Sequence, residues 1–246
     1  MKACLFDMDG VLTSTATLHA AAWKQMFDEY LQQRATQSGE PFVPFDTHDD
    51  YRQYVDGRAR ADGTRTFLAS RGIELPEGDP DDPPAATTVN GLSNRKNELV
   101  LAKIAEGKVE VYPGSVRYVE AVRAAGMPTA VVSASANTAQ VLEVAGIAHL
   151  FDARVDGVVA RERGLASKPA PDGFLAGAEA VGATAATSVV FEDALAGVEA
   201  GRNGHFAFVV GVDRVGQADD LRTHGADIVV TDLAELLDGE APQRAH

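Results

Sequence analysis

The sequence has very little cysteine and no long apolar run. Its one cysteine, Cys4, excludes an intrachain disulfide, and its place in the apolar run Ala3–Phe6 predicts a small buried side chain rather than a reactive thiol. No stretch reaches the roughly 18 uninterrupted apolar residues that a membrane-spanning helix needs. The run before Asp7 is also too short for the apolar part of a signal peptide. We therefore expect a soluble cytoplasmic protein that contacts no membrane.

The sequence is also poor in positive charge. It has 22 Lys and Arg against 36 Asp and Glu, so the formal net charge of the 246 residues is −14. A nucleic-acid partner would require a basic surface, and this balance argues against one. Small anionic substrates remain possible, because local groups can bind them against the overall field. Apolar residues at 45% and charged residues at 24% are typical of a globular protein and exclude a disordered chain.

Apolar strand-like runs alternate with helical segments over the second half of the chain. Glycines follow the expected helices, as a left-handed cap requires, and the strands are nearly continuous apolar runs. This alternation predicts an α/β fold with a doubly wound parallel sheet. We expect strands at 2–6, 128–133, 152–156, 188–191, 206–210 and 228–230, helices at 115–125, 137–145, 172–181 and 194–201, a loop from the third strand to Pro171, and a weak helix before the last strand.

The segment 14–110 has a different texture. Trp23, Phe27 and Leu31 belong to one apolar stripe of an expected helix, whereas no strong strand pattern occurs anywhere in the segment. We expect helices at 15–33, 65–71 and 98–105 and a loop at the Pro/Asp/Gly-rich link 76–84. The sequence therefore predicts a helical cap domain, 14–110, inserted into a catalytic core of 1–13 and 111–246.

Polar side chains follow the ends of several expected strands, at the edge where open α/β sheets bind ligands. They are Asp7, Asp9, Ser133, Lys168, Glu192 and Asp193. Each also has an ordinary structural explanation: a turn for Asp7 and Asp9, a helix cap for Ser133, a solvated surface for Lys168 and a helix N-terminus for the last acidic pair. Their combination on one edge favours a site.

This set of residue types suits phosphoryl transfer. Crowded carboxylates need a compensating cation, and an all-oxygen donor set suits Mg²⁺, which keeps positions for phosphate oxygens and water. Lys168 and Ser133 are suitable partners for the other oxygens of a phosphoryl group. One carboxylate can attack phosphorus to form an aspartyl-phosphate, and a second can move the proton.

The motif Asp7-Met8-Asp9-Gly10-Val11, followed by Ser133, Lys168 and Glu192-Asp193, resembles the four motifs of the haloacid dehalogenase superfamily. The helical insert resembles its type-one cap, so the resemblance covers the whole chain. It implies that Asp7 is the nucleophile and Asp9 the general acid–base, whose presence argues against dehalogenation. It further implies that Ser133 and Lys168 hold the phosphoryl group. The implied Mg²⁺ ligands are Asp7, Asp9, Glu192 and Asp193, with the backbone carbonyl of Met8.

Other segments resemble the β-phosphoglucomutase branch of this superfamily. They are Thr15, His19, Trp23 and Lys24 in the first cap helix, Ser133-Ala-Ser135-Ala-Asn137, Lys168-Pro-Ala-Pro-Asp172, Gly57-Arg58-Ala59-Arg60 and Arg95-Lys96-Asn97. The resemblance adds Thr15 and His19 to the catalytic set, with His19 tightening Asp9 on cap closure. The implied substrate-binding residues are Arg60, Lys96, Asn97, Trp23, Ser135 and Asn137. The alternatives are a helix-surface position for His19 and core packing for Trp23.

The resemblance implies a Mg²⁺-dependent phosphomutase that interconverts β-D-glucose 1-phosphate and glucose 6-phosphate. The reaction would use an aspartyl-phosphate and a glucose 1,6-bisphosphate intermediate, and the protein would act as a monomer on a small sugar phosphate. A sugar-phosphate phosphatase of the same superfamily is the alternative, with water as acceptor. A phospho-accepting receiver module is more distant, because its Asp lies on a later strand and its chain is shorter. The long stretches 34–56 and 76–92 leave the sugar open.

Overall fold

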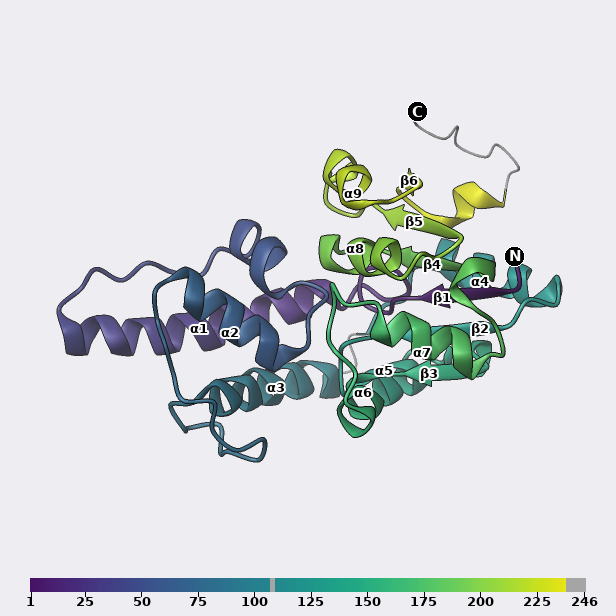
Figure 1. Cartoon of the computed structure of the whole chain (residues 1–246). Coiled ribbons are helices and arrows are strands. Elements are labelled where there is room, and N and C mark those ends of the chain that lie inside the picture. Colours follow the sequence, from purple (N-terminus) through teal and green to yellow (C-terminus); the bar gives the residue numbers. More distant parts are fainter. Residues whose placement is uncertain (107–108, 238–246) are drawn as a thin grey trace. The chain divides into compact units, whose positions relative to one another are not determined.

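The computed structural model describes residues 1–106 and 109–237 and divides into two compact units (Figure 1). The core unit comprises Met1–Thr15 and Val109–His246, and the helical unit comprises Ala16–Lys108. The chain thus leaves the core unit after its first strand and returns to it for the rest of the sheet. Within the described residues, no helix combines the length and apolar character needed to cross a membrane.

The core unit is built on a parallel sheet. Within the described residues it has six strands in the order β3-β2-β1-β4-β5-β6. The order changes direction at β1, where Cys4 pairs with Thr129 on one side and Val189 on the other. The predicted doubly wound α/β fold is therefore confirmed. The strands are β1 (Ala3–Phe6), β2 (Thr129–Val132), β3 (Ala153–Val155), β4 (Ser188–Glu192), β5 (Phe208–Val212) and β6 (Ile228–Val230).

Helices cover both faces of the sheet. Successive residues of a strand point to opposite faces, so neighbouring residues of β1 contact different helices. Leu5 belongs to the apolar cluster that includes residues of α7, α8 and α9. Its neighbour Phe6 stacks on Phe191 with ring centres 4.5 Å apart, and Tyr118 of α4 meets Phe6 edge-on at 6.3 Å. The helices of this unit are α4 (Pro113–Ala124), α5 (Thr138–Val144), α6 (Gly157–Arg163), α7 (Asp172–Ala180), α8 (Leu195–Asn203) and α9 (Ala218–His224).

The expected loop between β3 and Pro171 is wrong in its first part, which forms α6. Asp156 caps this helix, since its Oδ1 accepts hydrogen bonds from the backbone N–H groups of Val158 and Val159, both at 3.0 Å. Gly164 ends the helix with a φ of 64°. A helix of only two turns is too short to show a clear apolar period, so its caps were the only signal in the sequence.

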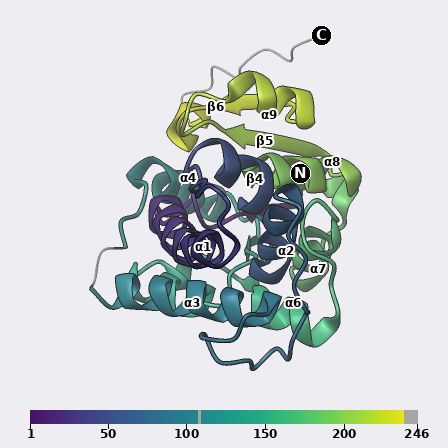
Figure 2. The same cartoon turned by 90° about the vertical axis from the view of Figure 1, so that its left-hand side faces the viewer.

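The helical unit contains α1 (Ala16–Ser38), α2 (Arg60–Ser70), α3 (Val89–Ala105) and the π-helical turn Tyr51–Val55 (Figure 2). The predicted stripe of α1 forms its core: Trp23 stacks on Phe27 at 5.2 Å, and Phe27 meets Phe67 of α2 at 4.1 Å. The helix α3 begins well before the predicted residue 98. Thr88 explains this earlier start, because its side chain accepts the N–H of Gly91 at 2.9 Å.

Candidate active site

Two carboxylates meet at the carboxyl edge of the central strands. The N–H of Asp7 donates to the carbonyl of Phe191 at 2.9 Å, which continues the β1–β4 ladder beyond β1. This contact places Asp7 beside Glu192, the last residue of β4. The side chains are buried, since Asp7 is 6% exposed and Glu192 is fully buried. Two buried acids at adjacent strand ends require a positive partner.

Lys168 is that partner. Its Nζ lies 2.5 Å from Oδ1 of Asp7 and also donates to Oε1 of Glu192. It further lies 5.1 Å from the ring centre of Phe174, the third residue of α7. Burial lowers the pKa of Lys168, but the two carboxylates more than offset this effect and raise it above its usual value. Burial raises the pKa of Glu192 to about 7, against the opposing charge of Lys168.

Asp9 is held by hydroxyl groups of its own turn. Thr15, which is 1% exposed, donates from Oγ1 to Oδ1 of Asp9. The Oγ1 atoms of Thr13 and Thr15 lie 2.7 Å apart. Oγ1 of Thr13 also lies 3.2 Å from the carbonyl oxygen of Met8, to which it donates. The chain itself therefore orients the carboxyl group of Asp9.

The acidic pair at the end of β4 fits against two glycines. A Cβ on Gly10, whose φ is +81°, would lie 1.7 Å from Oδ2 of Asp193. A Cβ on Gly197 in α8 would lie 1.7 Å from Oε1 of Glu192. Both carboxylates thus occupy space that any other residue at these glycines would fill, and Gly10 also needs its left-handed backbone. The side chain of Asp193 therefore lies directly against the turn that carries Asp7 and Asp9.

The donor set at this edge fits a divalent cation. Asp7, Asp9, Glu192 and Asp193 carry more negative charge than Lys168 alone can balance, and their oxygens are the hard donors that Mg²⁺ takes. Within the described residues no three His, Cys, Asp or Glu side chains form a ready-made metal cluster. Mg²⁺ needs only one or two protein carboxylates, because water and phosphate complete its shell.

Two expected metal ligands already accept hydrogen bonds within the protein. The oxygens of Glu192 accept hydrogen bonds from Lys168 and from the N–H of Ala194, the latter at 2.8 Å. The carbonyl of Met8 accepts the N–H groups of Leu12 at 2.9 Å and Thr13 at 3.0 Å, so it closes the turn instead of facing a ligand. The expectation that the Met8 carbonyl is a ligand is corrected on this ground.

Ser133 and its neighbours shape the turn between β2 and α5. Ser133 is 5% exposed, and its Oγ accepts the N–H of Ser135 at 3.1 Å. The Oγ of Ser135 in turn accepts the N–H of Asn137 at 3.2 Å. Both hydroxyls act as acceptors in these contacts, so their protons can be donated to a ligand oxygen. Ser133 does not cap α5, which was the alternative explanation for it.

The helical unit brings three predicted residues together. Nζ of Lys96 lies 2.8 Å from Nδ1 of His19 and 4.8 Å from the ring centre of Trp23. Burial, together with the charge of Lys96, lowers the pKa of His19 well below its usual value. Neutral His19 therefore accepts at Nδ1 and carries its proton on Nε2. Trp23 is only 2% exposed and packs in the core of its unit.

The remaining predicted residues of the helical unit lie on two helices. Arg60 is the first residue of α2, and its carbonyl accepts the hydroxyl of Thr64 at 2.9 Å. Asn97 follows Lys96 on α3. Both side chains are half-buried, whereas Lys96 is 5% exposed. Lys96 is therefore a buried cation held between an aromatic ring and a neutral imidazole, and it is not a solvated surface charge.

The sequence did not identify Thr13, Phe174 or Gly197. Thr13 lies in the turn between β1 and α1, and no pattern in the sequence indicated its contact with Thr15. Phe174 belongs to the apolar pattern of α7, and nothing distinguishes it there from core packing. No sequence pattern marks Gly197, because the need for glycine at this position comes from Glu192, whose side chain lies against it only in the folded protein.

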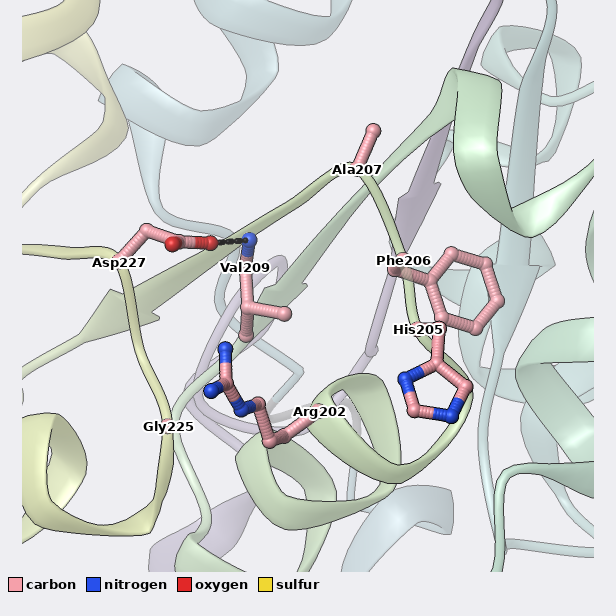
Figure 3. Close-up of a pocket in the computed structure, with 7 residues that line it drawn as sticks. All are labelled: Arg202, His205, Phe206, Ala207, Val209, Gly225 and Asp227. Carbon is pink, nitrogen blue, oxygen red and sulfur yellow. Dashed lines mark hydrogen bonds between the residues drawn. The ribbon is translucent and has the colours of Figure 1, made fainter.

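A cavity of about 280 Å³ lies elsewhere in the core unit (Figure 3). Its lining includes Ala207 just before β5, Val209 within β5 and Asp227 just before β6. Asp227 accepts the N–H of Val209 at 2.8 Å. These are the amino ends of parallel strands, whereas Asp7 and Asp193 follow carboxyl ends. The cavity is therefore separate from the acidic site.

The chain is similar in sequence and in structure to known proteins. A family model described as haloacid dehalogenase-like hydrolase matches residues 1–205. A β-phosphoglucomutase of Mycobacterium bovis is 58% identical over 96% of this chain and 92% of its own, and one of Bacillus subtilis is 28% identical over 96% and 92%. The crystal structure of a β-phosphoglucomutase from Clostridium difficile matches with a TM-score of 0.75 and 25% identity, covering 96% of this chain and 93% of that one.

Proposed function

Because the chain belongs to the haloacid dehalogenase-like hydrolase family, we propose that its acidic site is the phosphoryl-transfer site of a phosphomutase. The reaction is the interconversion of β-D-glucose 1-phosphate and glucose 6-phosphate. The names of the mycobacterial and Bacillus relatives support this activity. The observation that carries the proposal is the buried carboxylate of Asp7, held at one oxygen by Lys168 at the carboxyl edge of β1.

Asp7 acts as the nucleophile. An oxygen of the Asp7 carboxylate, which Lys168 holds in place, attacks phosphorus. A bond forms between this oxygen and phosphorus while the bond between phosphorus and the sugar oxygen breaks, which gives an aspartyl-phosphate. The ammonium of Lys168 and the hydroxyl of Ser133 hold the phosphoryl oxygens, where their donors stabilise the charge of the transition state.

Asp9 moves the proton. Its carboxyl group, oriented by Thr15, gives a proton to the departing sugar oxygen and later removes one from the hydroxyl that accepts the phosphoryl group. In the forward direction the enzyme phosphate passes to the 6-hydroxyl of β-glucose 1-phosphate, which produces glucose 1,6-bisphosphate. Return of the 1-phosphoryl group to Asp7 then leaves glucose 6-phosphate.

Mg²⁺ is the cofactor that these residues fit. Asp7 and Asp193 would hold it, whereas the two oxygens of Glu192 accept hydrogen bonds from Lys168 and from the N–H of Ala194. When bound, the ion supplies positive charge that reduces the repulsion between the phosphoryl group and the surrounding carboxylates. The oxygen-rich donor set of this edge favours Mg²⁺ over softer metals.

The bisphosphate intermediate has two anionic ends, so the enzyme needs a second phosphate-binding group. Arg60 fills this role in our proposal, because an arginine fork matches the oxygens of a phosphate. Lys96, Asn97, Ser135 and Asn137 bind the sugar, and His19 belongs to the proposed catalytic set. The ring of Trp23 packs against the ammonium group of Lys96. Glucose 1,6-bisphosphate is also the activator in this proposal, because it transfers a phosphoryl group to Asp7.

Steady-state assays test the proposal. The protein is supplied with β-glucose 1-phosphate, Mg²⁺ and a trace of glucose 1,6-bisphosphate, and glucose 6-phosphate and inorganic phosphate are measured together. We expect glucose 6-phosphate to form in large excess over phosphate. Release of phosphate without glucose 6-phosphate would instead make the protein a sugar-phosphate phosphatase, in which water accepts the phosphoryl group.

A further inference from the structure

The loop after β5 is built to face the catalytic turn. Oδ1 of Asp213 accepts the backbone N–H groups of Val215, Gly216 and Gln217 at 3.1, 2.7 and 2.8 Å. One carboxylate oxygen thus closes the loop around itself and fixes its backbone. The two long polar side chains of this loop, Arg214 and Gln217, both reach residues of the acidic site.

Arg214 joins the catalytic turn to the end of β6. Its Nε donates to the carbonyl of Gly10 at 2.9 Å, and Nη1 donates to the carbonyl of Thr231 at 2.6 Å. Nη2 lies 3.4 Å from the carbonyl of Val11. The Arg214 side chain is only 14% exposed. Its fork therefore bridges backbone groups that are far apart in the sequence.

The same guanidinium contacts the segment in which the chain re-enters the core unit. It lies 3.7 Å from the ring centre of Tyr112 and donates to Oγ of Ser115 at 3.3 Å. Ser115 itself donates to the carbonyl of Val11 at 2.6 Å, and the N–H of Tyr112 donates to the carbonyl of Leu12 at 2.9 Å. Arg214 thus ties the catalytic turn both directly and through Ser115.

Gln217 holds the other side of the site. It is 6% exposed, and its Nε2 donates to the carbonyl of Asp193 at 2.8 Å. The carboxylate of Asp193 in turn fills the space beside Gly10. A single loop therefore determines the positions of Gly10, through Arg214, and of Asp193, through Gln217.

We propose that Arg214 is a positioning residue for phosphoryl transfer, which holds the turn of Asp7 and Asp9 in register with Asp193. The need for such a clamp follows from Gly10, because a glycine at φ +81° has no side chain of its own to fix the turn. Arg214 lies outside the four motifs and beyond residue 205, where the family match ends. The inference rests on the proposed nucleophilic role of Asp7.

Formation of the aspartyl-phosphate tests this role without the sugar. Acetyl phosphate is the donor: an Asp7 oxygen attacks its phosphorus, the bond to the acetate oxygen breaks, and acetate leaves. The phosphorylated protein is counted by mass spectrometry after an acid quench, per folded molecule, for wild type, Arg214→Gln and Arg214→Lys. Arg222→Gln is the matched control, since Arg222 is an exposed arginine of α9 that pairs with Asp219.

We expect Arg214→Gln to lower the maximal phosphorylation rate by about tenfold to a hundredfold, with a KM for acetyl phosphate close to that of wild type. Arg214→Lys keeps the charge but not the fork, so it restores only a small part of the rate. Arg222→Gln stays near wild type. If Arg214→Gln does not fold, Arg214→Lys decides the question.

Two results overturn the inference in distinguishable ways. A wild-type rate per folded molecule in Arg214→Lys, or in Arg214→Gln, would make Arg214 merely structural even if the melting temperature falls. Failure of the wild-type protein to form an aspartyl-phosphate at Asp7 would remove the proposed function together with this inference. Wild-type phosphorylation that responds to Arg214 but gives no glucose 6-phosphate would retain the inference and reject the mutase.

Discussion

The Nζ atom of Lys168 lies 2.5 Å from Oδ1 of Asp7, although 161 positions separate the two residues in the sequence. The same ammonium donates to Glu192, so three charged side chains share one buried contact. This arrangement orients the carboxylate of Asp7 before any substrate binds. Substitutions of Asp7, Lys168 or Glu192 therefore need a folding control, because each removes part of this contact.

Replacement of the nucleophile should abolish the reaction. Asp7→Asn keeps the size of the side chain but removes the attacking carboxylate, so turnover should fall by more than about a thousandfold. No phosphorylated protein should be detected by mass spectrometry after incubation with glucose 1,6-bisphosphate. Circular dichroism and melting curves serve as folding controls. A variant that retains a tenth of wild-type turnover would exclude the covalent mechanism.

The role of Asp9 predicts a dependence on the leaving group. Asp9→Asn should slow transfer from glucose 1,6-bisphosphate to Asp7 by about a hundredfold or more, because the sugar oxygen needs a proton to leave. Transfer from acetyl phosphate should fall much less, since acetate leaves without protonation. Rapid-quench measurements with both donors provide the comparison. Equal losses with the two donors would contradict the assignment of Asp9 as the acid–base.

Arg60 should affect the sugar reaction and spare the enzyme phosphate. We expect Arg60→Ala to reduce formation of glucose 6-phosphate by about tenfold to a hundredfold, the effect of losing charge-assisted hydrogen bonds. Phosphorylation of Asp7 by acetyl phosphate should stay near the wild-type rate. Arg65→Ala is the matched control on α2, because Arg65 pairs with Asp62 and Glu77 at the surface. An unchanged mutase rate in Arg60→Ala would remove Arg60 from the second phosphate site.

His19 predicts a pH dependence of stability. Burial, together with Lys96, lowers its pKa in the folded protein, whereas the unfolded chain protonates it near 6.5. Below this pH the unfolded state binds more protons, so the free energy of unfolding falls as the pH drops, by at most about 1.4 kcal/mol per pH unit from this group. Above the unfolded pKa the contribution is fully present.

Urea unfolding at pH 7.5 and 5.5 measures this effect for wild type and His19→Gln. The variant lacks the titrating group, so its loss of stability between the two pH values should be smaller than that of wild type by about 1 kcal/mol. Carboxylates titrate equally in both proteins and cancel in the comparison. Identical losses would mean that folding does not lower the pKa of His19.

Gly197 should be required for activity although it lies in a helix and carries no functional group. A Cβ at this position would displace Oε1 of Glu192, which then could not accept the hydrogen bond of Lys168. We expect Gly197→Ala to lower turnover by about tenfold or more. The better helix propensity of alanine partly offsets the loss of stability. Wild-type turnover in this variant would show that Glu192 is free to move without consequence.

Much of the architecture could be predicted from local patterns. The strands β1, β2 and β4 are nearly continuous apolar runs, and each is followed by a polar residue. The parallel sheet and the edge at which these polar residues lie could therefore be predicted. The family resemblance drawn from the four motifs is confirmed by the family match. The helix α6 was missed because two turns show no period, and α3 was begun too late because the cap at Thr88 was overlooked.

Tertiary contacts explain what the sequence could not show. Arg214 is one arginine in a polar loop, and its link to Gly10 arises only when β5 lies beside β4 in the folded sheet. The hydrogen bonds that commit Glu192 and the carbonyl of Met8 likewise depend on the folded positions of Lys168 and of the turn after β1. The motifs predict which residues lie together at the site, whereas these contacts determine the role of each residue.

The most direct measurement is the fate of the enzyme phosphate. Protein labelled on Asp7 with ³²P from acetyl phosphate is mixed with β-glucose 1-phosphate and Mg²⁺ in a single turnover, and the label is followed into sugar bisphosphate and inorganic phosphate. The account predicts that most of the label passes to glucose 1,6-bisphosphate, much faster than it reaches water in the absence of the sugar. Label released only as inorganic phosphate, at a rate that the sugar does not change, would contradict it.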